Sequence, residues 1–346
     1  MKKSSHPTLN EVARKAGVGT TTVSRVINGG ARVSPETLAR VLEVIETLGY
    51  TPNQAARTLK GHRTKTIGLV IPSIADPFFS SCAEVAQAVA RAHDSLLIVT
   101  TTQNDAASEM ESLDVLIRHR ADGLLIAPSD SGSAQLRDML SRMTVPVVTI
   151  DRPVYNSSIA SVVADNYSGA RTATQHLIEH GYKRIVCLTG DRHLYTIGER
   201  IKGYRETIED AGLECILDTS ITDYNSTETA IKHLLDGPKP PDAIFALKNS
   251  NTMYAFEVLQ KLNVSVPSSI ALLGFDDFEL ASAVRPSISV IEQPVEEIAS
   301  IAAGLLFKPL EAGKAVQRSR SMHGELIKLE TRLIRRSSCG CTPVTT

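Results

Sequence analysis

The chain has 346 residues, enough for two or three domains, and 42% of them are apolar, which allows large buried cores. Trp is absent and aromatic residues make up only 4%, so these cores must be mainly aliphatic. No apolar run reaches the roughly 18–20 residues needed to cross a bilayer. The N-terminus also lacks the continuous apolar segment of a signal peptide. We therefore expect a cytoplasmic protein.

Charge is distributed unevenly along the chain. Residues 1–65 contain eleven Lys and Arg residues but only four acids, a net charge of +7, whereas the remainder holds 26 basic and 34 acidic residues, a net −8. A basic module joined to an acidic body is typical of a protein with a polyanionic partner. The alternative is a positive arm that serves only solubility. The motifs within residues 1–65 help to decide between these two interpretations.

The basic module is predicted to form three short helices. Thr8 and Glu11 have the spacing of a capping box. The helix that follows ends at Gly17, because glycine accepts the left-handed backbone of a C-terminal cap. A second helix is expected over residues 20–28, and a third over 34–48, where Ser-Pro-Glu supplies an N-cap followed by proline. Two short helices joined by a tight turn and packed by a third form a helix-turn-helix.

The second helix of a helix-turn-helix enters the major groove of DNA, with its N-terminal residues facing base edges. Here these are Thr20, Thr21 and Thr22, with Arg25 one turn later. Thr can hydrogen-bond bases or pack its methyl group on thymine, and Arg can bond guanine bidentately. A small three-helix domain with an ordinary polar face is the alternative. The clustered hydroxyls and the Arg within a basic module favour DNA binding.

A long motif runs through this module. It reads T-L-x-E-V-A-x-x-A-G-V-x-x-x-T-V-S-R-V-I-N over residues 8–28 and continues as L-G-Y-x-P-N over 48–53 and A-A-R-x-L over 55–59. The motif resembles the headpiece of the lac repressor/galactose repressor family of bacterial transcription regulators. The resemblance adds Thr8, Ser24 and Asn28 to the predicted DNA-binding residues.

The same resemblance implies a hinge helix over residues 53–60 that folds only on operator DNA. In that family two hinge helices pair in the minor groove, and the leucine matching Leu59 is wedged into a central base step. Such apolar wedges unstack and kink the duplex. Asn53, Ala56 and Leu59 are thereby predicted to contact DNA. The segment is short and basic, and so short a helix is marginal alone in water.

From residue 66 onward, strand-like apolar runs alternate with helical patterns. This alternation predicts parallel sheets with helices on both faces, and the number of runs suggests two similar subdomains. The body resembles type 1 periplasmic sugar-binding proteins, in which two α/β lobes hold the ligand in a cleft between them. The strand-like runs are 67–71, 96–100, 123–127, 145–150, 161–164, 184–188, 243–247 and 270–275.

The predicted fold class is an all-α three-helix headpiece plus hinge helix, joined to an α/β two-lobe core like that of the type 1 periplasmic binding proteins. The expected domains are the headpiece (1–52), the hinge and linker (53–65) and the core (66–346). Within the core, the N-lobe is expected to comprise residues 66–164 and 294–324, and the C-lobe residues 165–293 and 325–336.

The effector site is expected at the carboxyl ends of the core strands, where ligands of open α/β sheets bind. Phe78 or Phe79 can stack on a sugar face, and Arg200 and Asp276 can bond hydroxyls or charged groups. A carboxylate that only caps a strand end is the alternative for Asp276. The predicted effector-binding residues are Asp76, Phe78, Phe79, Ser129, Asp130, Arg200, Lys248, Phe275, Asp276 and Gln293.

Lys248 departs from the family pattern, because related chains usually have Asn-Asp where this one has Lys248-Asn249. An ammonium group opposite Arg200 suggests an anionic effector such as a sugar acid or a sugar phosphate. The alternative is that Lys248 pairs with Asp276 or points into solvent.

The sequence thus predicts a sequence-specific DNA-binding regulator, a repressor, controlled by a sugar, a sugar acid or a sugar phosphate. An enzyme is the second hypothesis, but dinucleotide, Walker and nucleophile-elbow motifs are missing. A transport component is the third, and the basic headpiece opposes it. Tetramers of the family that this chain resembles use a C-terminal leucine heptad. None is found here, so we expect a homodimer on a pseudo-palindromic operator, without membrane association. No cofactor is expected.

Metal binding is not predicted either. Cys339 and Cys341 form an isolated Cys-x-Cys in a polar C-terminal segment, which we expect to be disordered. His176 and His180 have the i, i+4 spacing that can bind a metal on a helix, but no third ligand is evident nearby in the sequence.

Overall fold

The computed structural model describes residues 7–27, 29, 32–50, 63–312 and 324–341. The chain divides into two compact units, residues 1–64 and 65–346. Each unit has its own hydrophobic core, as expected for independent domains. Within the described residues, no helix has the length and apolar character needed to cross a membrane.

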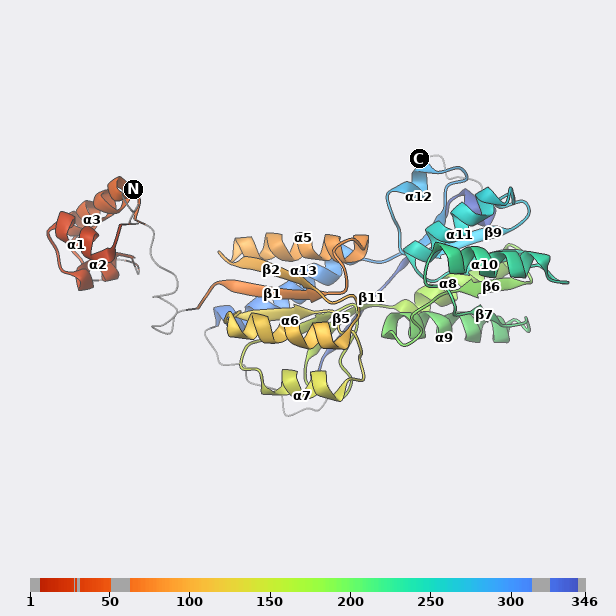
Figure 1. Ribbon diagram of the computed structural model, residues 1–346, viewed down its shortest axis with the longest axis horizontal. Coiled ribbons are helices and arrows are strands. Elements are labelled where there is room, and N and C mark those ends of the chain that lie inside the picture. Colours follow the sequence, from red (N-terminus) through yellow and green to blue (C-terminus); the bar gives the residue numbers. More distant parts are fainter. Residues whose placement is uncertain (1–6, 28, 30–31, 51–62, 313–323, 342–346) are drawn as a thin grey trace. The chain divides into compact units, whose positions relative to one another are not determined.

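The described part of the first unit consists of helices α1 (Leu9–Ala16), α2 (Thr20–Ile27) and α3 (Pro35–Leu48) (Figure 1). The predicted caps are present: Thr8 and Glu11 form a capping box, and Ser34 accepts a hydrogen bond from the Thr37 amide. Gly17 ends α1 at φ 64°, a left-handed backbone that suits glycine. Fully buried Val12, Val23 and Val41 hold the three helices together.

The second unit contains a first sheet with the strand order β11-β5-β4-β3-β1-β2, in which every described pairing is parallel. Its strands are β1 (Thr66–Ile71), β2 (Leu96–Thr101), β3 (Gly123–Ile126), β4 (Val147–Ile150), β5 (Ala160–Ala164) and β11 (Leu326–Leu329). Helices α5 (Pro77–Ala92) and α13 (Val295–Glu311) cover one face, and α6 (Ala106–Arg118) and α7 (Ala134–Arg142) cover the other (Figure 1).

The second sheet has the order β12-β10-β9-β8-β6-β7, and the β10–β12 pair is antiparallel. Helices α8 (Asn166–Glu179) and α9 (Tyr195–Asp210) cover one face, and α10 (Tyr224–Asp236) and α11 (Asn249–Lys261) cover the other. The strands are β6 (Ile185–Leu188), β7 (Ile216–Asp218), β8 (Ala243–Ala246), β9 (Ala271–Phe275), β10 (Ser289–Glu292) and β12 (Arg332–Ile334), and the short helix α12 spans Leu280–Ala283.

In the described part of the chain, the polypeptide passes between the two sheets at three places. It leaves the first sheet after β5, returns after β10, and crosses again between β11 and β12. The prediction that the C-lobe resumes at Glu325 is therefore wrong. Leu326–Leu329 pairs with β5 in the first sheet, and the chain reaches the second sheet only at Arg332. A strand in which apolar and polar residues alternate can pair at the edge of either sheet. The sequence pattern therefore did not show which sheet this strand joins.

The C-terminal segment is also ordered, contrary to expectation, as far as Cys341. After β12 it forms a 3-10 helix, η1 (Ser337–Cys339). The buried Ser338 hydroxyl donates to the Leu272 carbonyl and accepts from the Ser289 amide, so that η1 packs against strands β9 and β10. These contacts join residues about fifty or more positions apart, which a local sequence pattern does not reveal.

Candidate DNA-binding surface and effector cleft

The candidate DNA-binding surface lies on α2. Thr20, Thr21 and Arg25 are exposed, and Thr22 and Ser24 are half-buried, while Val23 and Val26 face the core of the headpiece. The polar residues at the start of α2 therefore lie where base contacts are made in a helix-turn-helix. The Thr8 hydroxyl is engaged in the α1 cap. The other predicted DNA contacts, Asn28, Asn53, Ala56 and Leu59, lie outside the described residues.

In the second unit, a cavity of about 180 Å³ lies where strand ends of the two sheets face each other. Most of the predicted effector-binding residues line it, because the carboxyl ends of parallel strands gather at one edge of each sheet. These are Asp76, Phe78, Phe79, Arg200, Lys248, Asp276 and Gln293.

Arg200 is the most extensively bonded residue of this group. Its side chain is 4% exposed and forms an ion pair with Asp276, with Nη1 3.3 Å from Oδ2. Its Nε donates to Oδ1 of Asn166 at 2.8 Å, and Nη1 donates to the Leu247 carbonyl at 2.7 Å. The guanidinium carbon also lies 3.7 Å from the centroid of the Phe275 ring. Because each side of the guanidinium is held, its orientation toward the cavity is fixed before any ligand arrives.

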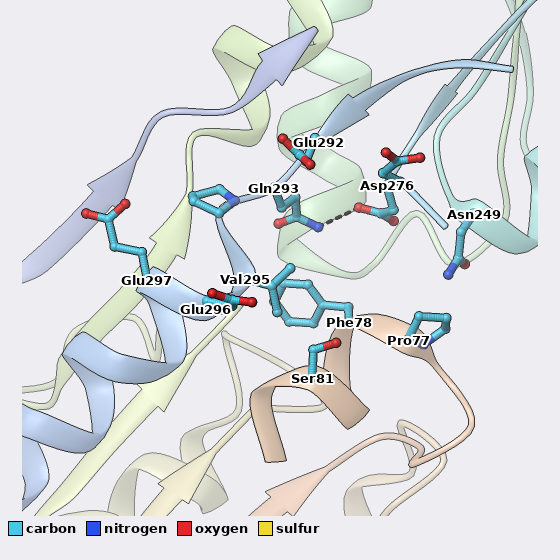
Figure 2. Close-up of a pocket in the computed structure, with 12 residues that line it drawn as sticks. Pro77, Phe78, Ser81, Asn249, Asp276, Glu292, Gln293, Val295, Glu296 and Glu297 are labelled. Atoms are coloured by element: carbon cyan, nitrogen blue, oxygen red, sulfur yellow. Dashed lines mark hydrogen bonds between the residues drawn. The ribbon is translucent and has the colours of Figure 1, made fainter. Parts of the chain in front are cut away.

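Asp276 and Gln293 complete a polar array at this edge. Nε2 of Gln293 donates to Oδ1 of Asp276 at 2.5 Å, as Figure 2 shows. Gln293 follows β10 at a point where the chain passes between the sheets. Two aromatic rings face the array, since Phe78 and Phe79 both line the cavity and meet edge to face at 5.0 Å. Alternating polar donors and acceptors beside aromatic rings suit a polyhydroxylated ligand.

Three predicted effector contacts do not line this cavity, within the described residues. Phe275 is fully buried beneath Arg200, which it orients by stacking. The Ser129 side chain is buried too, and its amide donates to Glu109. Asp130 is exposed, and its carboxylate accepts a hydrogen bond from the Gly132 amide within its own loop. These residues follow or end strands, but their side chains belong to the core or to a turn.

Asp151 and Arg152 line the cavity without having been predicted. They follow β4, and the Arg152 side chain bonds Asp151 at 3.0 Å, Asn104 at 2.7 Å and the Pro128 carbonyl at 3.0 Å. Their position directly after a buried strand was the signal that could have revealed them. The other lining residues that were not predicted are Pro72, Ser73, Gln103, Asn104, Leu194, Thr196 and Ile197.

The charges around the cavity are balanced. Among the described lining residues, Asp76, Asp151 and Asp276 face Arg152, Arg200 and Lys248. Burial raises the pKa of Asp76, with the Asp276 charge adding to the effect, while Lys248 lowers it. Burial likewise raises the pKa of Asp151, against the neighbouring Arg152. Both arginines are paired with a carboxylate.

A larger cavity of about 470 Å³ adjoins the first and shares Phe78, Asp276 and Gln293 with it. In Figure 2, Glu296 and Glu297 at the start of α13 border this space together with Ser81 of α5. A ligand held at the Arg200 array therefore has an opening toward an acidic rim. The two spaces together leave room for more than a single sugar ring.

Comparison with known proteins agrees with both units. Residues 8–53 match the family model of bacterial regulatory proteins of the lacI family, and residues 64–326 match that of the periplasmic binding proteins and sugar binding domain of the LacI family. The ribose operon repressor of Escherichia coli (strain K12) is 32% identical over 302 residues, which cover 86% of this chain and 92% of that protein. The transcriptional regulator CelR of Thermobifida fusca is 34% identical over 348 residues, which cover 98% and 100%.

Solved structures share the fold. A CelR–cellobiose complex has a TM-score of 0.69 at 31% identity and covers 96% of this chain and 99% of its own. The lac repressor dimer bound to operator and an anti-inducer has a TM-score of 0.83 at 22% identity over 97% and 99%, a likeness of fold. The predicted headpiece and two-lobed core are thereby confirmed. The chain belongs to the lacI family of bacterial regulatory proteins and is a DNA-binding regulator of transcription.

Proposed function

We propose that this protein is a repressor whose affinity for operator DNA is set by a neutral sugar bound in the cleft between the two sheets. It acts inside the cell as a homodimer on a pseudo-palindromic operator and carries out no catalysis. The Thr20–Arg25 face of each α2 contacts bases. The segment 53–60, which lies outside the described residues, serves as the hinge helix, with Asn53 and Ala56 at the DNA and Leu59 as its minor-groove wedge.

The observation that supports a sugar is the array of Arg200, Asp276 and Gln293 beside Phe78 and Phe79. Sugar hydroxyls both donate and accept, so they can bond a guanidinium, a carboxylate and an amide at once. The aromatic rings suit the apolar face of a pyranose or furanose. Relatives point the same way, since one is named a ribose operon repressor and the CelR structure contains cellobiose.

The balance of charge favours a neutral ligand over an anionic one. The lining offers three carboxylates against three cations, and both arginines already have a carboxylate partner. A ligand carboxylate or phosphate would lie near Asp76 and Asp276 and would compete with them for Arg200 and Lys248. The sugar acid or phosphate suggested by Lys248 opposite Arg200 is therefore the second candidate, and its anion would bind at Lys248.

Binding assays on the full-length protein test this proposal. An operator is first selected from a random duplex library, and its affinity is then measured by fluorescence anisotropy with panels of neutral sugars, sugar acids and sugar phosphates. A neutral sugar should change operator affinity by about 5- to 150-fold, the usual range of allosteric coupling. If only sugar acids or phosphates act, and Lys248→Asn abolishes their effect, the neutral ligand is wrong. Failure to select any DNA sequence would contradict the proposal that the protein is a repressor.

A further inference from the structure

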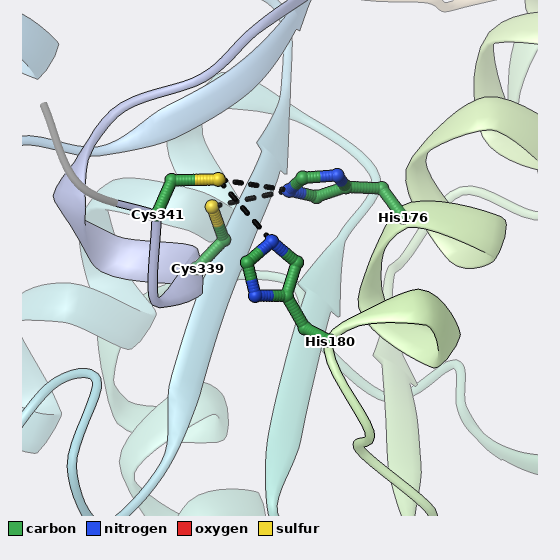
Figure 3. A group of neighbouring side chains, drawn as sticks. All are labelled: His176, His180, Cys339 and Cys341. Atoms are coloured by element: carbon green, nitrogen blue, oxygen red, sulfur yellow. Dashed lines mark hydrogen bonds between the residues drawn. The ribbon is translucent and has the colours of Figure 1, made fainter. Parts of the chain in front are cut away.

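The strongest unexplained feature of the second unit is a cluster of two histidines and two cysteines. His176 lies in the last turn of α8, and His180 is the C-cap residue of that helix. Cys339 ends η1, and Cys341 follows two residues later. The chain thus brings together two pairs of residues more than 150 positions apart. Figure 3 shows the four side chains converging on one point.

The distances within the cluster match those of a tetrahedral metal site. His176 Nε2 lies 3.3 Å from Cys339 Sγ and 3.5 Å from Cys341 Sγ, and His180 Nε2 lies 3.2 Å from Cys341 Sγ. Donor atoms of all four residues lie within 4.8 Å of one another. With Zn–S near 2.3 Å and Zn–N near 2.0–2.1 Å, a tetrahedral centre separates sulfur from nitrogen by about 3.6 Å. One ion therefore fits among them with small side-chain movements.

The backbone around the cysteines supports this convergence. Gly340, between the two cysteines, has φ 92°, a left-handed conformation that favours glycine. A side chain there would also lie 2.9 Å from the Tyr182 hydroxyl. The Tyr182 hydroxyl donates to the Cys339 carbonyl, and the Ser289 hydroxyl donates to Cys339 Sγ at 3.0 Å. Neighbours that orient a ligand in this way are typical of metal sites.

We propose that His176, His180, Cys339 and Cys341 bind one Zn²⁺ ion. Two thiolates and two neutral imidazoles form the Cys₂His₂ set of structural zinc sites and cancel the charge of the ion. Cys339 and His176 are buried, whereas His180 is exposed, so the site has a closed interior and an outward side by which the metal enters. The site joins the C-terminal segment to α8. It is separate from the cleft, because none of its residues lines either cleft cavity.

Both ligand pairs of this site can be recognised in the sequence, but the sequence does not show that they lie close together. His176 and His180 have metal-binding spacing on a helix, and Cys339-Gly-Cys341 offers a second pair. Each pair alone is an incomplete ligand set. The η1 segment packs against β9 and β10 and thereby places the two cysteines beside the two histidines.

Elemental analysis of the untagged full-length protein tests the proposal, since a histidine tag would itself bind metal. Protein purified under reducing conditions and dialysed against metal-free buffer should contain about one zinc per chain. The zinc should fall to background in Cys339→Ser/Cys341→Ser and in His180→Gln. The matched controls Cys215→Ser and His233→Gln, both at exposed positions elsewhere, should retain it.

A second measurement avoids relying on variants that fail to fold. Zinc is removed from the wild-type chain with a chelator, and Co²⁺ is added in its place. Tetrahedral cobalt with thiolate ligands should give intense d–d bands and a sulfur-to-cobalt charge-transfer band, and both should vanish when zinc is restored. Chelation should also lower the melting temperature of the wild-type protein but not that of Cys341→Ser. Reduced protein that takes up neither zinc nor cobalt overturns the proposal, as does equal zinc in the double cysteine variant.

Discussion

Arg336 and Asp277 form a bidentate ion pair, with Nη1 2.9 Å from Oδ1 and Nη2 2.7 Å from Oδ2. Arg336 Nη1 also donates to the Ile288 carbonyl. The pair connects the C-terminal segment to the residue beside Asp276, a carboxylate that lines the candidate effector cleft. The C-terminal segment is therefore part of the framework that positions the cleft.

Replacing Arg336 by Ala should destabilise the core. The substitution removes charged hydrogen bonds and leaves Asp277 half-buried without its cation, so the free energy of unfolding should fall by about 1.5–3 kcal/mol. Urea denaturation followed by circular dichroism measures the change. Arg335→Ala, an exposed neighbour, serves as control. Strictly additive effects of Arg336→Ala and Asp277→Ala in a double-mutant cycle would show that the pair contributes no coupling.

Asp276→Asn should weaken effector binding while sparing DNA binding. The asparagine keeps the size of the side chain but removes the charge that Arg200 and Gln293 both contact. Charge-assisted hydrogen bonds are about twice as strong as neutral ones, so we expect roughly tenfold or greater loss of affinity for the sugar. Isothermal titration calorimetry measures that affinity. Asp130→Asn, which lies outside the cavity lining, should bind the sugar as the wild type does.

Arg25→Ala should reduce discrimination between DNA sequences. An exposed Arg on α2 that bonds a guanine bidentately contributes about 1–3 kcal/mol of selectivity for that base. The measured quantity is the ratio of specific to nonspecific affinity at one fixed salt concentration. Arg40→Ala removes an equal charge from the exposed surface of α3 and should leave this ratio unchanged. The same loss of selectivity in both variants would argue against base contact by Arg25.

Asp76→Asn should alter the pH dependence of stability. Burial raises the pKa of Asp76 in the folded protein, so its ionised form is disfavoured there. The contribution of Asp76 to wild-type stability should therefore fall as pH rises from the unfolded pKa, about 3.9, through the raised folded pKa. The variant lacks this loss and retains an N-cap for α5, since Asn accepts from the Phe78 amide as Asp does.

Chemical denaturation between about pH 3, which lies below the unfolded pKa, and neutral pH compares the two proteins. The free energy of unfolding of the variant should increase relative to that of the wild type as pH rises. The difference between the two should be smallest at the acid end. A variant that is less stable at neutral pH would contradict this explanation. Asp105→Asn provides a control, because that carboxylate caps α6 at an exposed position and its pKa is lowered.

Features set by neighbouring residues could be predicted from the sequence. The Thr8–Glu11 capping box and the glycine at the end of α1 form as expected, because the groups involved lie within one or two helical turns. Strand ends likewise predicted seven of the sixteen residues that line the smaller cleft cavity. The same rule failed at Phe275 and Asp130, because it gives the place of a residue but not the direction of its side chain.

Features that depend on distant pairing could not be predicted in this way. The register of Leu326–Leu329 beside β5 is decided by competition between two sheet edges, which the strand itself does not encode. The position of Arg152 directly after β4 was visible in the sequence, but its partners Asn104 and Pro128, which follow two other strands, were not. The position of Cys339 beside His176 likewise depends on the whole second sheet being formed.

The passage of the chain between the sheets limits how the core can move. A single connection would let the lobes swivel freely, whereas the described crossings after β5, after β10 and between β11 and β12 restrain twisting and leave bending as the softest motion. Gln293 lies on one of these crossings and also contacts the cleft carboxylate. Under the proposed function, a sugar that bonds this amide would act on a connection between the sheets, and Gln293 would couple occupancy of the cleft to the angle between the lobes.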